Sequence, residues 1–288
     1  MILAPTPVST AFLTALALIA FAANSVLCRI ALGQELIDAA SFASIRVISG
    51  AMVLAMIALP RWHRRGYERA DFWAAAALFL YMVCFSYAYI SLSTGTGALI
   101  LFGAVQITMF IAALRAGEEF VLLSWIGLSL AGGGLIYLVL PGVTAPDPTG
   151  ASFMAMAGVG WGWYTLRGRN VRDPLGATAN NFLVGIPPVV IVSFIFLQTQ
   201  QTSLAGILLA VASGAVASGL GYVIWFAALP GLTTTRAATV MLSVPVIAAF
   251  GGVIFLSELV TTRLVVASLA ILGGIWLVLA QKSPRPAS

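Results

Sequence analysis

Long apolar runs, separated by short polar segments, follow one another along almost the whole chain. Each run is close to the roughly 20 residues that a helix needs to cross the hydrocarbon core of a bilayer. The pattern therefore predicts ten transmembrane helices, at Phe12–Leu32, Ala39–Leu59, Phe72–Leu92, Gly95–Leu114, Leu122–Leu140, Gly150–Leu166, Ala177–Leu197, Leu204–Leu229, Ala237–Leu256 and Leu264–Ala280.

Strands that cross a membrane alternate between apolar and polar residues, because one face of the barrel lines its lumen. The runs of this chain are apolar on all sides, and this favours an all-α integral membrane protein. The first run contains Ala20-Phe21-Ala22, which resembles a signal-peptidase site. No Lys or Arg precedes Arg29, however, and the run continues beyond the site, so we expect this helix to remain in the mature protein.

Composition supports the same interpretation. Only 8% of the 288 residues are charged and 61% are hydrophobic, whereas a soluble domain has about 25% charged residues. Soluble enzymes, nucleic-acid binders and secreted disulfide scaffolds are thereby excluded. The two cysteines, Cys28 and Cys84, lie within apolar runs, where cysteine packs as a small hydrophobic residue.

The cations predict the orientation of the chain. Eleven of the fourteen fall at one side of the predicted membrane: Arg61, Arg64, Arg65, Arg69, Arg115, Arg167, Arg169, Arg172, Arg236, Lys282 and Arg285. Arg29 and Arg263 fall at the other side, and Arg46 lies within the second helix. Because short cytoplasmic loops carry the excess of Lys and Arg, we expect both termini in the cytoplasm.

Two halves of the chain, residues 1–144 and 145–288, form a weak internal repeat at an offset of 140 residues. Thr94–Ala98 aligns with Thr234–Ala238, and Gly133-Gly134 with Gly273-Gly274. Further matches are Glu118 with Glu258, Phe21 with Trp161, Ser25 with Thr165, Arg29 with Arg169 and Phe42 with Phe182. Five helices in each half give the second half the opposite orientation. Inverted repeats of this kind are typical of transporters that bind substrate near the midplane and work by alternating access.

These features resemble the drug/metabolite transporter superfamily, in particular its ten-helix EamA-type permeases. The resemblance rests on the stretch Trp161–Arg169, on Thr234–Glu258 with Pro245 between, and on the repeated small residues at helix ends. It is strongest to bacterial inner-membrane exporters of aromatic and other neutral amino acids, which also pass methyl viologen. Other branches imply a sugar-phosphate or nucleotide-sugar carrier, or a drug:proton antiporter. The family often has proline where Val105 stands, so Pro245 alone supplies the helix break.

Polar and aromatic residues within the spans are candidates for the substrate pathway, because polar groups are costly in hydrocarbon. Asn24 and Gln106 can each donate and accept hydrogen bonds, although each could equally bond a neighbouring helix. Aromatic rings suit an aromatic side chain or a cation, although interfacial belts and core packing use the same spacing. The aromatic candidates are Tyr81, Phe85 and Tyr89 in one helix, Trp161 and Tyr164 in another, and Tyr222 and Trp225 in a third.

Arg46 has two interpretations. It could contact a substrate anion, but we favour snorkelling to the outer surface or an ion pair with Glu35 or Asp38. Prolines free backbone carbonyls, which makes Pro187, Pro188 and Pro245 candidate hinges. The glycines Gly158, Gly162 and Gly132–Gly134 favour close helix contacts within one chain, with a dimer face as the alternative.

The absence of a carboxylate or histidine deep in a span predicts a uniporter, because proton-coupled carriers use such a group as a relay. The chain has no zinc-protease or nucleophile-elbow motif, and we expect no enzyme activity, cofactor or metal. A channel needs a ring of repeated carbonyls or charges, which a single inverted-repeat chain does not supply. We expect a monomer in a lipid bilayer, with an amino acid as its partner and no nucleic acid.

Overall fold

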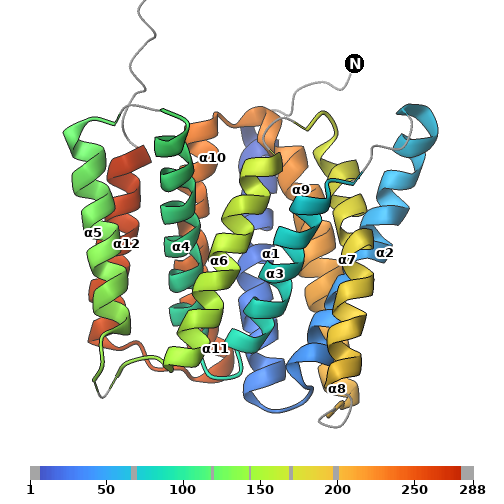
Figure 1. Ribbon diagram of the computed structural model, residues 1–288, viewed down its shortest axis with the longest axis horizontal. Helices are drawn as coiled ribbons and strands as arrows, with labels where there is room; N and C mark the ends of the chain where they lie inside the picture. Colours follow the sequence, from blue (N-terminus) through green and yellow to red (C-terminus); the bar gives the residue numbers. More distant parts are fainter. Residues whose placement is uncertain are drawn as a thin grey trace, which may run out of the picture.

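The protein is described by a computed structural model, which defines residues 7–65, 70–117, 120–142, 144–168, 171–196 and 201–279. These residues form an all-α integral membrane protein (Figure 1). Extended structure in the described ranges is limited to an isolated bridge between Ile37 and Thr202. Five of the predicted matches and cations, Arg69, Glu118, Arg169, Lys282 and Arg285, lie outside the described residues.

Ten helical segments occupy the ten positions that the apolar runs predict in the described part of the chain. The first half contains α1 (Pro7–Gly33), α2 (Ala39–Arg65), α3 (Phe72–Ala88), α4 (Thr94–Arg115) and α5 (Leu122–Val139). The second half begins with α6 (Pro148–Gly168) and α7 (Pro174–Ile195). Its eighth segment joins α8 (Leu204–Val211), the π-helix η2 (Ala212–Leu220), α9 (Gly221–Ala228) and the 3₁₀ turn η3 (Leu229–Gly231). The last two segments are α10 (Thr234–Met241) with α11 (Ser243–Leu256), and α12 (Thr262–Leu279).

Eight of these helices are long and apolar enough to cross a membrane by length and composition. The 22 residues of α4, for example, extend about 33 Å, close to the thickness of a hydrocarbon core. Two segments differ. Helix α3 has only 17 residues because it ends at Ala88, four residues before its predicted end. Helix α6 is not among the eight, because glycine, tryptophan, tyrosine and threonine replace aliphatic residues along it.

The three interior prolines have different local effects. The helix break predicted at Pro245 is confirmed, because α10 ends at Met241 and α11 begins at Ser243. Proline has no N–H to bond the carbonyl four residues earlier, and here that carbonyl belongs to Met241. By contrast, α7 continues without interruption through Pro187 and Pro188. The role of all three prolines as hinges remains a prediction.

Helices of the two halves are interleaved in space. Helix α3 packs along α6 and α7, while the α8–η2–α9 segment packs along α1 and α2. Helix α4 packs on α6, and α11 packs on α1. Three further pairs join one half to the other: α2 with α7, α4 with α11, and α5 with α12 at one edge of the molecule (Figure 1).

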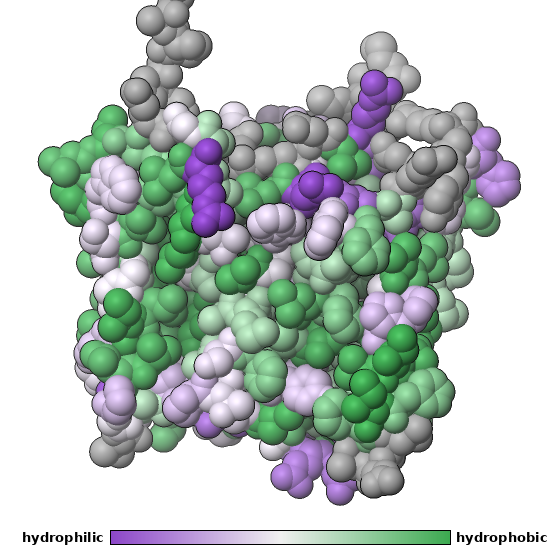
Figure 2. Space-filling model, in the orientation of Figure 1, coloured by the Kyte–Doolittle hydropathy of each residue, from purple (hydrophilic) through white to green (hydrophobic). Residues whose placement is uncertain are grey.

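The surface matches a bilayer environment. A broad hydrophobic band covers the middle of the molecule, and hydrophilic residues gather near its two ends (Figure 2). Many large apolar side chains are exposed, such as Met56 on α2, Ile126 on α5 and Phe194 on α7. Lipid therefore provides the apolar environment that the helices do not provide for one another.

Exposed arginines concentrate at the end of the molecule where α1 begins and α12 ends (Figure 1). They are Arg61, Arg115, Arg167, Arg172 and Arg236. Two of them join neighbouring helices there: Arg61 pairs with Asp173 at 3.4 Å, and Arg167 pairs with Asp71 at 2.6 Å. Asp71 also caps α3 by accepting hydrogen bonds from backbone amides. Burial tends to raise the pKa of Asp71, but the bonds from Arg167 and the amides outweigh it and lower that pKa below 3.8.

Glycines bring several helix pairs into close contact within the chain. Gly158 and Gly162 of α6 face α4, and Gly160 on another face contacts α3. Gly127 of α5 and Gly274 of α12 face each other so closely that a Cβ on either would overlap the carbonyl oxygen of the other. Gly134 also faces α12, whereas Gly132 and Gly133 have open space beside them. The predicted intramolecular use of Gly158, Gly162 and Gly134 is confirmed.

The contact between α5 and α12 predicts a position-specific loss of stability. Gly274→Leu forces the two backbones apart, so we expect the protein in detergent to lose about 1–3 kcal/mol of stability. Gly273→Leu is the matched control, because a Cβ at Gly273 meets no atom within 4 Å. Thermal unfolding of both variants checks this. Equal losses in the two variants would contradict the close packing of α5 on α12.

Candidate functional site

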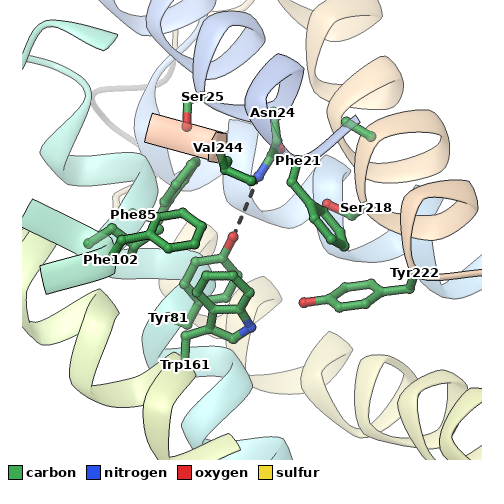
Figure 3. Close-up of a pocket in the computed structure, with 12 residues that line it drawn as sticks. Phe21, Asn24, Ser25, Tyr81, Phe85, Phe102, Trp161, Ser218, Tyr222 and Val244 are labelled. Atoms are coloured by element: carbon green, nitrogen blue, oxygen red, sulfur yellow. Dashed lines mark hydrogen bonds between the residues drawn. The ribbon is translucent and has the colours of Figure 1, made fainter. Parts of the chain in front are cut away.

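A small cavity lies near the middle of the bundle and is lined by both halves of the chain (Figure 3). The first half contributes Phe21, Asn24, Ser25, Tyr81, Phe85, Leu101 and Phe102, and the second contributes Trp161, Ala217, Ser218, Tyr222 and Val244. Its volume of about 20 Å³ holds about one water molecule. The walls must therefore separate before a molecule as large as an amino acid enters.

Aromatic rings form most of the cavity wall. Tyr81 and Trp161 are stacked, with ring centroids 5.8 Å apart and an angle of 24° between the planes. Phe102 meets Trp161 edge-on at 5.3 Å. Tyr222 lies across the cavity from this stack and meets Phe21 edge-on at 5.7 Å (Figure 3). Rings in this arrangement provide faces for an aromatic or aliphatic side chain and for a cation.

A chain of buried polar groups runs along the cavity and joins four helical segments. Ser213 of η2 donates a hydrogen bond of 2.5 Å to Oδ1 of Asn24 in α1. Nδ2 of Asn24 donates a longer bond of 3.5 Å to the hydroxyl of Tyr81 in α3 (Figure 3). The same hydroxyl accepts a 3.0 Å bond from Nη2 of Arg46 in α2. Asn24 therefore bonds two helices and also faces the cavity.

Arg46 ends this chain and is fully buried, with 0% of its surface exposed. Its guanidinium lies over the rings of Phe85 and Tyr81, 4.7 Å and 5.3 Å from their centroids. Nε and Nη1 have no hydrogen-bond partner, and no ion pair joins Arg46 to a carboxylate among the described residues. The favoured interpretation of Arg46 is therefore wrong: the side chain neither snorkels to the surface nor pairs with Glu35 or Asp38.

The reason is geometric. Arg46 lies seven residues into α2, and its side chain points toward α3, where aromatic rings receive the guanidinium. Each ring contact contributes up to about 2 kcal/mol when it is desolvated, and the bond to Tyr81 contributes about 1.5–3 kcal/mol. A buried ion costs several kcal/mol, and each unpaired donor adds about 1–3 kcal/mol. Arg46 thus lacks hydrogen-bond acceptors for two of its nitrogens, Nε and Nη1.

Gly214 in the π-helix η2 lets the α8–η2–α9 segment approach α2 closely. A Cβ at Gly214 would overlap the backbone carbonyl of Arg46 and the hydroxyl of Ser49. The extra residue in a π-helical turn shifts the register of the residues after it. Ser213, on one side of Gly214, reaches Asn24, while Ser218, a turn later, lines the cavity. Interrupted helical hydrogen bonding of this kind is frequent at functional sites.

Not all sequence candidates share the cavity. Asn24, Tyr81, Phe85, Trp161 and Tyr222 line it together.

The other aromatic and polar candidates lie outside the cavity lining. Trp225 stands outside the lining, with its ring 6.1 Å from that of Phe21. Gln106 is half-buried on α4, one turn beyond the lining residue Phe102. Tyr164 is buried, and its hydroxyl shares a 2.9 Å bond with Thr178 of α7 rather than facing the cavity. Tyr89, at the end of α3, lies toward the end of the bundle opposite the exposed arginines.

Several residues that line the cavity, or that bond a lining residue as Ser213 does, were not predicted from the sequence. Phe21 could have been found, because the internal repeat aligns it with Trp161. Ser213 and Ser218 lie in a run of small residues that gives no sign of a π-helix. Leu101 and Val244 are ordinary apolar residues in apolar spans, and nothing in the sequence separates them from lipid-facing neighbours.

A polar cluster joins four segments at the end opposite the arginine-rich end. Arg29 of α1 pairs with Glu258, with Nε and Oε1 3.4 Å apart. Glu258 accepts hydrogen bonds of 3.0 and 2.8 Å from the backbone N–H of Thr94, where α4 begins. Arg29 also donates to the carbonyls of Tyr89 and Ile90, just after α3. The helices around the cavity are therefore held together at this end, which we call the Arg29–Glu258 cluster.

Helix α4 is more deeply buried at the end near the Arg29–Glu258 cluster than at its other end. Nearly every residue from Thr94 to Val105 is buried, whereas Phe110 is the buried residue among those from Gln106 to Arg115. Helix α4 is thus buried near the Arg29–Glu258 cluster and more exposed toward the arginine-rich end. In the described part of the chain, no group of three His, Cys, Asp or Glu side chains is placed to hold a metal ion.

A polytopic helical protein with a central cavity shared by two halves has an architecture found in membrane transporters. Comparison with known proteins finds a transporter family that matches the second half of the chain. The sequence profile of the EamA-like transporter family matches residues 148–280. The chain is 48% identical to the uncharacterized protein PA1977 of Pseudomonas aeruginosa over 278 residues, which cover 96% of this chain and 97% of that protein. It is 24% identical to an uncharacterized transporter of Archaeoglobus fulgidus over 210 residues, 70% of this chain and 74% of that one.

One solved crystal structure superposes on this chain with a TM-score of 0.64 at 18% identity, and the match covers 91% of this chain and 95% of that chain. At this identity the likeness shows a common fold. The second half of the chain is thus similar to the EamA-like transporter family. The described residues form an all-α, multi-pass membrane protein.

The bond between Asn24 and Ser213 predicts energetic coupling across α1 and η2. We expect Asn24→Ala and Ser213→Ala each to cost about 1 kcal/mol, as for a typical hydrogen bond. The double variant should lose clearly less than the sum, because both changes remove the same bond. Reversible unfolding in detergent measures the cycle, and strictly additive losses would show that the bond does not form.

Proposed function

We propose that the protein exports amino acids, aromatic and other neutral ones, across the bacterial inner membrane by alternating access. The observation that carries this proposal is the central cavity, which is walled by aromatic rings and polar groups from both halves of the chain. Its rings suit an apolar or aromatic side chain. Asn24 and the hydroxyls of Ser25 and Ser218 suit the polar groups of an amino acid.

Packing between helices supports the two inverted repeats, residues 1–144 and 145–288. If α1 to α5 correspond in order to the five segments that begin with α6, the contact of α3 with α6 corresponds to that of α9 with α1. The contact of α4 with α6 likewise corresponds to that of α11 with α1. The pairs α2 with α7, α4 with α11 and α5 with α12 each correspond to themselves. A two-fold relation between the halves gives this pattern.

The arginine-rich end supports a cytoplasmic position for both termini, since short cytoplasmic loops carry the excess of cations. The Arg29–Glu258 cluster then closes the outer end of the bundle, and the looser packing of α4 faces the cytoplasm. An exporter takes up its substrate from that side. Outward release requires the Arg29–Glu258 cluster to separate.

A phosphorylated substrate fits less well. A phosphate group with two negative charges is usually bound by several cationic or backbone donors. Arg46 is the one buried cationic side chain in the described ranges. An amino acid carboxylate carries a single negative charge, which this one arginine can neutralise.

Uniport is supported by the types of polar residue that are buried in the described part of the chain. The buried polar residues of the described ranges are serine, threonine and asparagine side chains with Arg46, and they include no carboxylate or histidine. A proton relay normally needs such a group. Substrate movement down its own gradient needs none.

Transport in proteoliposomes tests both the substrate and the coupling. We expect vesicles loaded with radiolabelled phenylalanine to release it at a rate that a pH gradient, imposed at zero membrane potential, leaves unchanged. Protein-free vesicles and the Trp161→Ala variant, which removes one wall of the aromatic stack, are the controls. Release accelerated many-fold by the gradient would contradict uniport. The absence of protein-dependent release for every amino acid of a panel would contradict the proposed substrate.

The Arg29–Glu258 cluster predicts a conformational effect of Glu258→Gln. Loss of the carboxylate charge weakens the bonds to Thr94 and Arg29 and favours separation of the outer ends of the helices. Cys28, buried beside Arg29, reports on this opening.

In a Cys84→Ser background, we expect a membrane-impermeant methanethiosulfonate added from outside to label Cys28 several times faster in Glu258→Gln than in the parent. Glu35→Gln is the control, because Glu35 is exposed at the same end and belongs to no ion pair among the described contacts. Equal labelling in all three proteins would contradict the gating role of the cluster.

A further inference from the structure

We infer that Arg46 is the receptor for the substrate's carboxylate, and that the protein selects substrates by their anionic group. This inference rests on the proposed function and adds the chemical group that the site requires. A neutral ring-lined cavity alone would accept an apolar amine or amide as readily as an amino acid. Arg46 gives the site a fixed positive charge beside those rings.

The structure shows a charge that lacks its partner. Arg46 is completely buried, and two of its three guanidinium nitrogens, Nε and Nη1, have no hydrogen-bond partner. Its single bond goes to the hydroxyl of Tyr81, which is a neutral group. The guanidinium presents five N–H donors that match the oxygens of a carboxylate. An arriving carboxylate thus supplies the charge and the acceptors that the protein lacks here.

Tyr81 connects Arg46 to the cavity. Its ring lines the cavity against Trp161, and its hydroxyl holds Nη2 of Arg46. The cavity is too small for substrate in this state, so the walls move when substrate enters. We assign to the Tyr81 hydroxyl the place that a carboxylate oxygen takes on Arg46 in the loaded state. The aromatic side chain of the substrate then lies among the rings of Trp161 and Tyr222.

The same charge disfavours cationic substrates. A dication such as methyl viologen gains from aromatic faces, but it would have to lie close to an unneutralised guanidinium in a low-dielectric region, where like charges repel strongly. An amino acid brings one charge of each sign, and its ammonium group can contact a ring face or Oδ1 of Asn24. The structure thus favours amino acids over methyl viologen.

Four ligands that share one side chain test the inference on the wild-type protein. L-phenylalanine has both charged groups, 3-phenylpropionate keeps the carboxylate, and phenylalaninamide and phenethylamine keep the ammonium. Each ligand is tested as a competitor of radiolabelled phenylalanine for binding to the purified protein in detergent. We expect phenylalanine and 3-phenylpropionate to compete, and the amide and the amine to compete at least about tenfold more weakly, as for loss of a charge-assisted hydrogen bond.

Variants then connect this preference to Arg46. Arg46→Gln should bind phenylalanine at least about tenfold more weakly and lose the preference over phenylalaninamide, for the same reason. Arg46→Lys should keep a reduced preference because it keeps the charge. Arg115→Gln is the control: Arg115 is exposed at the end of α4 and lies outside the cavity lining, so the preference should remain.

The outcomes separate the two proposals. If the wild-type protein binds phenylalanine and phenylalaninamide equally well, Arg46 does not select for a carboxylate, and this inference fails while amino acid export stands. Retention of the preference in Arg46→Gln has the same meaning. If no amino acid of the panel is bound or transported, the proposed function itself fails. The wild-type comparison decides the question even if Arg46→Gln does not fold.

Discussion

The positive charge of Arg46 within a hydrocarbon environment is the constraint on which the rest of the site depends. A guanidinium cannot lose its proton in a protein, so the surroundings must stabilise it or a ligand must neutralise it. Here the surroundings do so in part, through the rings of Phe85 and Tyr81 and the hydroxyl of Tyr81. A protein built for stability alone would place a carboxylate or an apolar residue at this position. An incomplete site is what a carrier of anionic or zwitterionic substrates requires.

The packing around Arg46 follows from small residues that let backbones approach. Gly214 in η2 rests on the backbone of α2 beside Arg46, and this contact brings Ser213 to Asn24. Close approach leaves a central cavity of only about 20 Å³. The Arg29–Glu258 cluster holds α1, α3 and α4 together at one end, whereas α4 is more exposed toward the other end. The two ends of the bundle therefore differ, which the proposed alternating access requires of any single conformation.

Helix positions could be predicted from the sequence because lipid requires every span to be apolar and helical. Helix boundaries were predicted less well: α3 ends at Ala88, four residues before the end that hydropathy predicts. Asn24, Tyr81 and Trp161 were found because polar and aromatic residues stand out in an apolar chain. The burial of Arg46 could not be predicted, since snorkelling and burial differ only in what neighbouring helices offer the side chain. Ser213 was missed for a related reason: a π-helix in a run of small residues has no sequence signature.

A structure determined with bound L-phenylalanine tests the central claim most directly. The account predicts density for the ligand between the rings of Trp161 and Tyr222, with its carboxylate oxygens within hydrogen-bond distance of the guanidinium of Arg46 and the Tyr81 hydroxyl displaced from Nη2. Density for phenylalanine with its carboxylate bound elsewhere, and with Arg46 still held by Tyr81 alone, would contradict it.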